Sequence, residues 1–371
     1  MYYVAMLSRL YLDNFRCFVN FEYKPERKQL LLGTNGSGKS SLLEAIRYIK
    51  SFVTGGDNPF TPSTRTRWQD KDIQIIEVDS ILDSREYQYR LEIRFEPEIR
   101  QSSVNLESLK ISGATSFERT NRELRFFAES FLQGTAAPPD AARSALHLSR
   151  LSNPQVGRFM EWLESVHCFE IDAYFDAMDE PADSGESQPD FELGNFPSWY
   201  RYLLQTQPAE NVAFLKAVKE SMDGFQELRF YSSGGSSERL RAVFRTPANE
   251  LVNYSISELS DGQRRLLGLY AILIFLISKG CTVFIDEPDN FISLREIQPW
   301  LLASEEAVED HRGQLILISH HPEILNQWAL RYGLRFFREN NGHVRTEKFK
   351  VDPKMQLQPA DVIARGWEDD A

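Results

Sequence analysis

The nine residues "GTNGSGKSS" at Gly33–Ser41 decide the fold of this 371-residue chain. They follow the apolar run Leu30–Leu32, which is typical of a buried strand, and they precede a helical pattern. That pattern repeats apolar residues at three- and four-residue spacing, at Leu42, Leu43, Ile46 and Ile49. Gly33–Ser40 fits G-x-x-x-x-G-K-[ST] in full. An ordinary strand-to-helix turn is the alternative, and the matching context on both sides favours a phosphate-binding loop.

Each residue type in this loop has a physical purpose. Glycines let backbone N–H groups turn inward around phosphate oxygens, and the helix that begins near Gly38 presents its positive end to the same anion. Lys39 is long enough to reach the β- and γ-phosphates of a nucleotide, and the Ser40 hydroxyl is a ligand for Mg²⁺. The loop therefore predicts binding of ATP together with Mg²⁺.

Composition narrows the class of protein. The net charge is −12 and 42% of the residues are hydrophobic, which suffices for one large domain or two ordinary ones. Such an acidic chain binds DNA only through a local basic patch, because phosphate contacts need Lys or Arg. The three cysteines, Cys17, Cys168 and Cys281, are far apart, which argues against a zinc site or a disulfide framework.

The sequence also predicts a cytoplasmic protein with no membrane partner. Arg9, Asp13 and Arg16 interrupt the apolar positions near the start, so no secretory signal is expected. The apolar stretch Leu266–Ile277 is shorter than the ~20 residues that span a bilayer. A buried helix is the better interpretation of that stretch.

The pattern of elements divides the chain into three parts. Residues 1–100 are expected to form an N-terminal lobe whose strands include an antiparallel hairpin over 73–95. In residues 236–371, buried strands alternate with helices, which indicates a mostly parallel α/β sheet. Strands are expected there at 239–245, 282–286, 314–319, 334–338 and 343–349, and helices at 262–279, 294–308 and 322–329.

Residues 101–235 have a different character and are expected to be an α+β insertion. Short strands are predicted at 104–111, 116–119 and 123–127, and helices at 141–151, 155–166 and 208–222. The acidic stretch "DEPADSGESQPD" at Asp179–Asp190 is interpreted as a mobile linker. Most aromatic residues of this part are expected to form a small core of their own. The cluster Phe191–Tyr202 is predicted to anchor a protein partner, through Trp199 and Tyr200 above all.

Three further motifs carry chemistry. "TVFIDEP" at Thr282–Pro288 is an apolar strand that ends in two carboxylates, where a solvated turn is the alternative to a metal and water site. "ELSDGQRRLL" at Glu258–Leu267 opens the buried helix, and Ser260 suits its N-cap while Gly262 leaves room for close backbone approach. As a local pattern, an ordinary helix start explains it equally well. "LILISHHPEIL" at Leu315–Leu325 places two histidines after a buried strand.

These four motifs, in this order, resemble the heads of ABC-type ATPases, and above all the RecF, SMC and OLD-type group, which includes bacterial genome-maintenance and anti-phage proteins. "LYLDNFRCF" at Leu10–Phe18 is similar to the strand that opens those heads. The resemblance covers residues 1–100 and 236–371. It implies an α/β fold, that of a P-loop ABC-type ATPase head, with a mixed, mostly parallel sheet flanked by helices, an antiparallel N-terminal β-subdomain and an α+β insertion.

The resemblance also implies roles for single residues. Catalytic roles fall to Lys39, Glu287 as the base for the attacking water, and His320 as the sensor of the γ-phosphate. Mg²⁺ would be held by Ser40 and Asp286. ATP would be bound by Asn35, Gly36, Ser37, Gly38, Lys39, Ser40, Ser41, Arg16 and Gln69, where Gln69 is preferred to Gln74 as the Q-loop residue. The signature residues Ser260, Asp261, Gly262 and Gln263 would reach ATP bound to a second copy of the chain.

Two departures from the family pattern bear on function. Ser293 stands where these heads usually carry Asp or His, and too few residues follow His320 for the nuclease domain of OLD proteins. The resemblance therefore implies an ATPase that dimerises on ATP and controls a separately encoded effector, a nuclease being one candidate, in bacterial anti-phage defence. A RecF- or SMC-like DNA-binding ATPase is the alternative, with Arg65, Arg67 and Lys71 as a phosphate-contacting patch. A transporter subunit fits the motifs and their spacing poorly.

Overall fold

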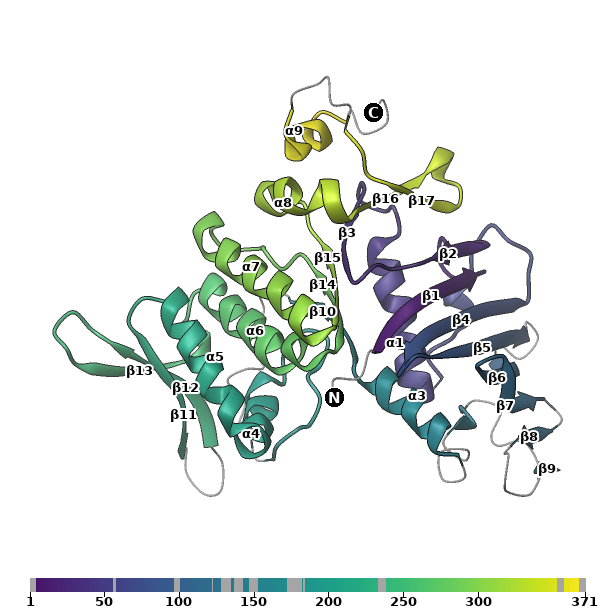
Figure 1. Ribbon diagram of the computed structural model, residues 1–371, viewed down its shortest axis with the longest axis horizontal. Coiled ribbons are helices and arrows are strands. Elements are labelled where there is room, and N and C mark those ends of the chain that lie inside the picture. Colours follow the sequence, from purple (N-terminus) through teal and green to yellow (C-terminus); the bar gives the residue numbers. More distant parts are fainter. Residues whose placement is uncertain are drawn as a thin grey trace.

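The computed structural model describes residues 5–55, 58–96, 101–121, 123–127, 135–136, 143–146, 153–171, 182, 184–232, 238–351 and 357–366. These residues form three β-sheets with helices between and around them (Figure 1). The described residues also include the short 3-10 helices η1 (Pro62–Thr64), η3 (Ile256–Glu258), η4 (Ile277–Lys279) and η5 (Glu339–Asn341).

A six-stranded sheet forms the centre of the molecule. Its strand order is β10-β14-β15-β3-β16-β17, and all neighbours are parallel except β16 and β17. The strands are β10 (Val166–Glu170), β14 (Thr282–Asp286), β15 (Gln314–Ile318), β3 (Lys28–Leu32), β16 (Gly333–Arg338) and β17 (Val344–Lys348). The buried strands predicted around the motifs are confirmed, whereas β10 was not predicted.

Alternation along the central strands separates two hydrophobic cores. Val283 and Ile285 pack into one core, and Phe284 between them packs into the other. The first core is covered by α6 (Asp261–Phe275), α7 (Leu294–His311) and α8 (Pro322–Tyr332). The second contains α1 (Lys39–Val53) and α3 (Pro154–Glu164). The central sheet is therefore flanked by helices, as the α/β fold class requires.

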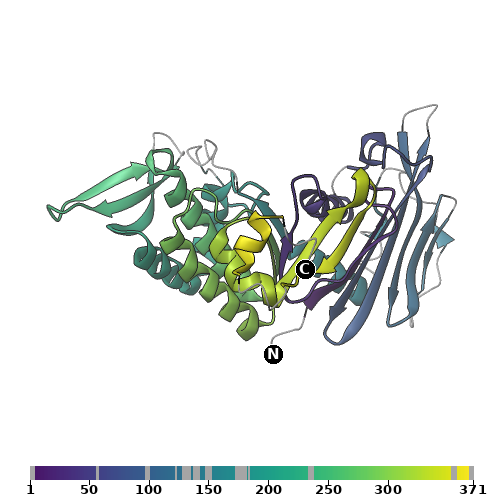
Figure 2. The same cartoon turned by 90° about the horizontal axis from the view of Figure 1, so that it is seen from above.

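An antiparallel sheet of eight strands covers the outer side of α1 (Figures 1 and 2). Its order is β2-β1-β4-β5-β6-β7-β8-β9. The strands are β1 (Ala5–Asp13), β2 (Phe21–Tyr23), β4 (Ile73–Leu82), β5 (Arg85–Glu96), β6 (Gln101–Ile111), β7 (Ala114–Thr120), β8 (Leu124–Phe126) and β9 (Thr135–Ala136). The predicted hairpin is β4–β5, paired from Ile73↔Arg94 to Leu82↔Arg85.

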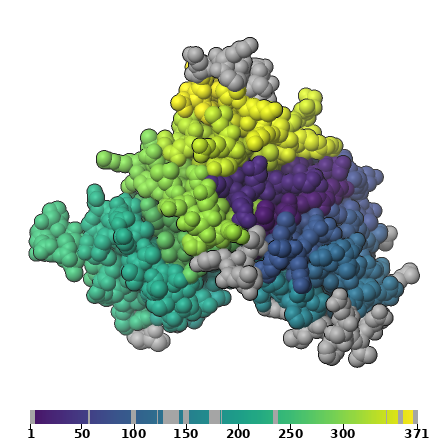
Figure 3. All heavy atoms as spheres, in the orientation of Figure 1, coloured from purple at the N-terminus to yellow at the C-terminus, as the bar shows by residue number. Residues whose placement is uncertain are grey.

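A small third sheet lies at the opposite edge of the molecule, where Figure 3 shows it as a projection. It consists of β11 (Phe225–Ser232), β12 (Glu238–Arg245) and β13 (Leu251–Ser255), all antiparallel. Helices α4 (Phe196–Thr206) and α5 (Pro208–Ser221) join it to α6, and α9 (Pro359–Ala364) packs on α8. Within the described ranges, no helix combines the length and the hydropathy that crossing a membrane requires.

The elements of residues 101–235 are shared among all three sheets. β6, β7 and β8 extend the antiparallel sheet, which confirms the three predicted strands, and β10 joins the central sheet. Helix α5 confirms the prediction over 208–222, whereas the helix predicted over 141–151 lies largely outside the described residues. The three-part division of the chain remains a prediction from the sequence.

The aromatic residues of this stretch do not form a core of their own, so that expectation is wrong. Trp199 and Tyr200 are 1% and 0% exposed, and they pack with α6 in the same core as the central sheet. The Trp199 ring meets Phe275 of α6 edge-on at 6.2 Å. Large aromatic side chains on the buried face of α4 release more free energy by packing there than by remaining available to a partner. They are therefore core residues and not partner anchors.

The described part of the expected linker is held by hydrogen bonds. The Asp190 carboxylate accepts the backbone N–H groups of Glu192, Gly194 and Asn195 at 2.8–3.1 Å. The Asn195 side chain in turn donates to the Gln188 carbonyl at 3.0 Å. Residues 179–181 and 183 of the linker lie outside the described residues.

Candidate active site

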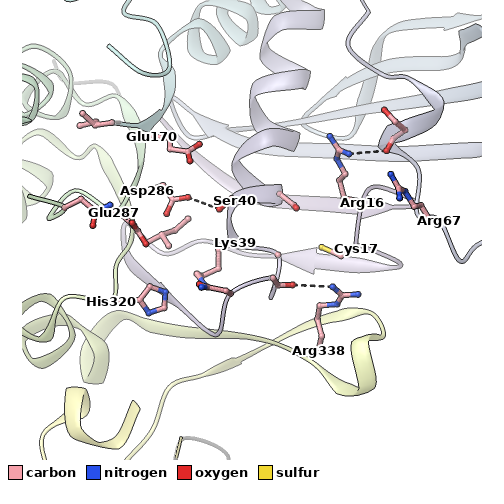
Figure 4. A pocket seen from close by; sticks show the side chains of 18 of the residues that line it. Arg16, Cys17, Lys39, Ser40, Arg67, Glu170, Asp286, Glu287, His320 and Arg338 are labelled. Carbon is pink, nitrogen blue, oxygen red and sulfur yellow. Dashed lines mark hydrogen bonds between the residues drawn. The ribbon is translucent and has the colours of Figure 1, made fainter. Parts of the chain in front are cut away.

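A cleft of about 750 Å³ lies at the carboxyl ends of β3, β10, β14 and β15. This is the edge of a parallel sheet where ligands gather in open α/β folds. Figure 4 shows that its polar side chains divide into two groups on either side of Lys39. The carboxylates and His320 lie on one side, called here the carboxylate end, and Arg265 also lines the cleft there, beside Glu287. Arg16, Arg67 and Arg338 lie on the other side, called here the arginine end.

The phosphate-binding loop lies between the two ends. Gly36 and Gly38 have φ of +79° and +109°, values that L side chains rarely adopt. A Cβ atom at Gly33 would lie 2.2 Å from the Phe336 carbonyl oxygen, so only glycine fits there. Helix α1 begins with no side-chain cap and no acidic residue in its first turn. Its N–H groups are therefore directed at the cleft without an anionic side chain as competitor, which suits a phosphate.

Lys39 lies over this loop. Its Nζ donates to the carbonyl oxygens of Gly33 at 2.6 Å and Thr34 at 3.1 Å. Burial lowers the pKa of Lys39, and the carboxylates of Asp286 and Glu287 oppose that shift. The ammonium group thus connects the loop with the carboxylate end.

At the carboxylate end, Ser40 Oγ donates to Asp286 Oδ2 at 2.9 Å. The loop and the end of β14 are thereby in direct contact. Burial raises the pKa of Asp286 to about 6, and the nearby carboxylates of Glu170 and Glu287 add to the shift. A hydroxyl and a carboxylate are hard oxygen ligands, and the crowded negative charge favours a cation, so these residues fit Mg²⁺. Mg²⁺ typically takes only one or two protein carboxylates and completes its shell with phosphates and water.

Glu287 is held in an unusual backbone conformation with φ of +47°. Its N–H donates to the Ile318 carbonyl at 2.8 Å, and its own carbonyl accepts from Arg265 Nη1 at 2.7 Å. Asn290 donates its amide to the Glu287 carboxylate. Non-glycine residues at positive φ persist only where the surroundings hold them, and such positions concentrate at functional sites. Glu287 is thus fixed beside Asp286 at the edge of the cleft.

The two histidines after β15 have separate positions. His320 lines the cleft, and burial together with the Lys39 charge lowers its pKa, which favours the neutral imidazole. His321 is the N-cap of α8 and accepts the Glu323 N–H at 3.2 Å. Of the pair, only His320 is therefore available to a ligand in the cleft.

The arginine end contains Arg16, which was predicted, and also Arg67 and Arg338 (Figure 4). Arg16 binds the Glu44 carboxylate through two nitrogens, at 2.5 and 2.8 Å. Part of its charge is therefore neutralised within the chain. Asn35, Gly36, Gly38, Lys39, Ser40 and Ser41 of the predicted set also line the cleft, and Ser37 is a buried member of the loop that hydrogen-bonds to Lys39.

The signature residues lie outside this cleft. Ser260 caps α6 by accepting the Gln263 N–H, and the Gln263 side chain accepts the Ser260 N–H in return. A Cβ atom at Gly262 would lie 2.6 Å from the Phe291 carbonyl oxygen, which confirms the expected close approach. Asp261 pairs with Arg264. None of the four signature residues lines the cleft of its own chain.

Neither candidate for the Q-loop glutamine lies in the cleft. Gln69 is outside its lining, and Gln74 is fully buried and donates to the Asn14 carbonyl at 2.8 Å. Glu170 is a cleft residue that was not predicted from the sequence. It ends β10 directly opposite Asp286 and lines the cleft. A comparison of "VHCFE" at Val166–Glu170 with "TVFID" at Thr282–Asp286 would have indicated it, since both are largely apolar runs that end in a carboxylate.

Comparisons with known proteins fit this geometry. The family model described as "AAA domain, putative AbiEii toxin, Type IV TA system" matches residues 30–326. The chain belongs to this family. The match spans the phosphate-binding loop, the signature, Asp286-Glu287 and His320, so all four motifs lie within the family's domain. No curated protein matches the chain.

Two solved structures have a fold similar to that of this chain. The Smc head domain from Pyrococcus furiosus, solved with an extended coiled coil and bound to the C-terminal domain of ScpA, has a TM-score of 0.50 at 11% identity, covering 99% of this chain and 100% of that one. The SMC head domain from Thermotoga maritima has a TM-score of 0.47 at 14% identity, covering 93% and 99%. The family match and the shared fold confirm the predicted P-loop ATPase α/β fold, which is similar to that of an SMC head domain.

Proposed function

We propose that this protein hydrolyses ATP with Mg²⁺ in the cleft. The observation that supports the proposal most is the 2.9 Å hydrogen bond between Ser40 and Asp286, with Glu287 next in the chain. It joins a complete phosphate-binding loop to a carboxylate pair, which is the arrangement that phosphoryl transfer to water requires.

Each residue has a role in this chemistry. The loop N–H groups and Lys39 bind the β- and γ-phosphates and stabilise the charge that develops there. Ser40 and Asp286 would hold Mg²⁺, which would neutralise negative charge on the phosphate oxygens. Glu287 orients the attacking water and accepts its proton, and neutral His320 donates a hydrogen bond to the γ-phosphate.

Steady-state ATP hydrolysis by the purified chain tests this proposal. Lys39→Ala should reduce turnover at least about 100-fold, because it removes the charge that stabilises the transferred phosphoryl group. Lys216→Ala is the matched control, since Lys216 lies on α5 with a side chain that is 77% exposed. A Lys39→Ala protein that hydrolyses ATP at the wild-type rate contradicts the proposal.

We further propose that ATP joins two copies of the chain. The signature residues do not line their own cleft, and Ser260 begins a helix whose N-terminus suits the γ-phosphate of a second copy. Light scattering of the Glu287→Gln protein should show a dimer with ATP and a monomer without it. A monomer under both conditions counts against the dimer, and so does an oligomer that ATP leaves unchanged.

The proposed biological role is control of a separately encoded effector in bacterial defence. The family description refers to a putative toxin and to a toxin–antitoxin system, which supports a defence setting. Co-purification from the native host, with wild type and Lys39→Ala side by side, identifies the effector. Protection against phage should be lost in the Lys39→Ala protein. Retained protection would show that the defence role does not depend on ATP hydrolysis.

DNA binding is the second candidate. The patch expected at Arg65, Arg67 and Lys71 is partly neutralised, because Lys71 pairs with Asp13 at 2.9 Å and Arg65 lies 3.8 Å from Asp72. Arg67 lines the cleft. The observation that favours DNA is instead β12, where Arg239, Arg241 and Arg245 share the strand face opposite the buried Leu240 and Ala242. Arg239→Glu with Arg241→Glu should abolish a salt-dependent shift of fluorescent DNA, whereas Lys216→Glu should not.

A further inference from the structure

Two large aromatic side chains that line the cleft, Trp68 and Phe291, have no role in phosphate chemistry, and Trp68 is the one among the arginines. Trp68 lies in the loop between η1 and β4, is 47% exposed and lines the cleft. Other tryptophans are deeply buried, at most 2% exposed: Trp162, Trp199, Trp300 and Trp328. An indole left half in water at the wall of a polar cleft loses the free energy of burial, which suggests a ligand that covers it.

The Trp68 ring is held by the hairpin of β16 and β17. Its Nε1 donates to His343 Nδ1 at 3.3 Å, and the two ring planes are tilted by only 18° with their centres 6.3 Å apart, so His343 holds the indole at its edge. The Arg338 guanidinium lies 5.3 Å from the centre of the Trp68 ring. Both partners come from the same hairpin, so the ring is positioned before any ligand arrives.

Arg338 also connects this ring to the phosphate-binding loop. Its Nη1 donates to the Gly36 carbonyl at 3.3 Å, and its Nε donates to the Gly342 carbonyl at 2.8 Å. One arginine side chain therefore bridges the loop and Trp68, a span that a nucleoside triphosphate bound at the loop can cover. Figure 4 shows Arg338 and Arg67 across Lys39 from Asp286 and Glu287.

We propose that Trp68 and Arg338 form the nucleobase subsite of the cleft, with the base of a purine nucleoside triphosphate stacked on the indole. This inference rests on the proposed function, because it takes the loop as the phosphate site. With the γ-phosphate at the carboxylate end, the rest of the nucleotide extends toward the arginine end. Aromatic faces and guanidinium planes both stack on bases, and the larger purine ring gains more contact than a pyrimidine.

Calorimetric titration separates the base from the phosphates. The protein is Glu287→Gln in every case, and the probes are Mg-ATP, Mg-UTP and inorganic triphosphate. Adding Trp68→Ala should raise the Kd for ATP about tenfold and leave triphosphate binding unchanged. Trp68→Phe should keep most of the ATP affinity, because a phenyl ring still stacks. Tyr254→Ala, which truncates an exposed aromatic on the distant β13, is the matched control.

Fluorescence provides a second readout. ATP should change the tryptophan emission of the parent protein, and Trp68→Phe should remove that change while calorimetry still detects binding. Unchanged ATP affinity in Trp68→Ala overturns the inference and leaves the proposed function standing. An equal loss of triphosphate binding also overturns it, because the effect would then not arise from the base. A parent protein that binds no nucleotide overturns both proposals.

Discussion

The two ends of the cleft are built from different parts of the fold. The carboxylate end is made of residues that directly end or follow parallel strands, with Glu170 on β10, Asp286 on β14 and His320 after β15. The arginine end is made of loops and a hairpin, with Trp68 before β4 and Arg338 at the end of β16. Side chains at neighbouring strand ends are fixed by the sheet, whereas those of loops are fixed only by their contacts.

This difference suggests a division of work. Hydrolysis needs charges and a base held to within a fraction of an ångström, which the strand ends provide. Binding of the base tolerates more positional freedom, because stacking depends on the area of contact between the rings. We therefore expect changes at the carboxylate end to reduce kcat and changes at the arginine end to raise KM.

The largest effect is expected from Glu287→Gln. Loss of the base that accepts the proton of water should lower kcat by about 10²–10⁴-fold and leave ATP affinity unchanged. Turnover and calorimetric titration measure the two quantities. Glu306→Gln, an exposed glutamate on α7, is the control, and turnover near wild type in Glu287→Gln would show that the base is another residue.

A smaller effect is expected from Arg265→Met, which removes the hydrogen bond to the Glu287 carbonyl. Arg265 is 1% exposed, so the carbonyl would be left without this donor and Glu287 would lose part of its orientation. We expect kcat to fall about tenfold, by analogy with the loss of one positioning contact, with little change in KM. Thermal unfolding must accompany the assay, and Arg265→Lys should restore part of the rate. A rise in KM at constant kcat would place Arg265 in binding.

Glu170→Gln should act through Mg²⁺. Glu170 lies opposite Asp286 in neighbouring strands, which are ~4.8 Å apart, so it adds negative charge beside the metal ligands. Its neutralisation should raise the Mg²⁺ concentration for half-maximal activity about fivefold, as one screened charge at this distance predicts. Titration of Mg²⁺ at saturating ATP measures it, and an unchanged requirement would exclude Glu170 from the metal's surroundings.

The smallest effect is expected from Arg16→Ala at the arginine end. Glu44 already neutralises part of the Arg16 charge, so KM should rise only about threefold, in the range of a partly exposed ion pair. The double variant Arg16→Ala with Glu44→Gln should resemble the single variant, because Glu44→Gln only removes the carboxylate that Arg16→Ala has left without its partner. A fall in kcat would move Arg16 from binding to chemistry.

The sequence predicted the carboxylate end better than the arginine end. Lys39, Ser40, Asp286, Glu287 and His320 were all expected from local motifs, and all of them line the cleft. Such motifs are readable because a strand, its end and the next helix are contiguous in the chain. Their catalytic roles remain proposals.

Trp68 and Arg338 were not predictable in the same way. They are far apart in the sequence and meet only because β16 pairs with β3, which carries the phosphate-binding loop. Glu170 was missed because its short strand directly follows a helical pattern over 155–166. β13 was missed because "LVNYS" at Leu251–Ser255 is mostly exposed and lacks clear alternation. Non-local pairing of this kind leaves no local pattern in one sequence.

The most direct test of the account compares Glu287→Gln with Trp68→Ala in one steady-state experiment over a range of ATP concentrations. Opposite ends of the cleft should separate the two kinetic parameters. We expect Glu287→Gln to lose kcat at unchanged ATP affinity and Trp68→Ala to lose affinity, with KM raised about tenfold at a kcat near wild type. If both variants change the same parameter, or if Trp68→Ala changes neither, the division of the cleft into a hydrolytic end and a base-binding end is wrong.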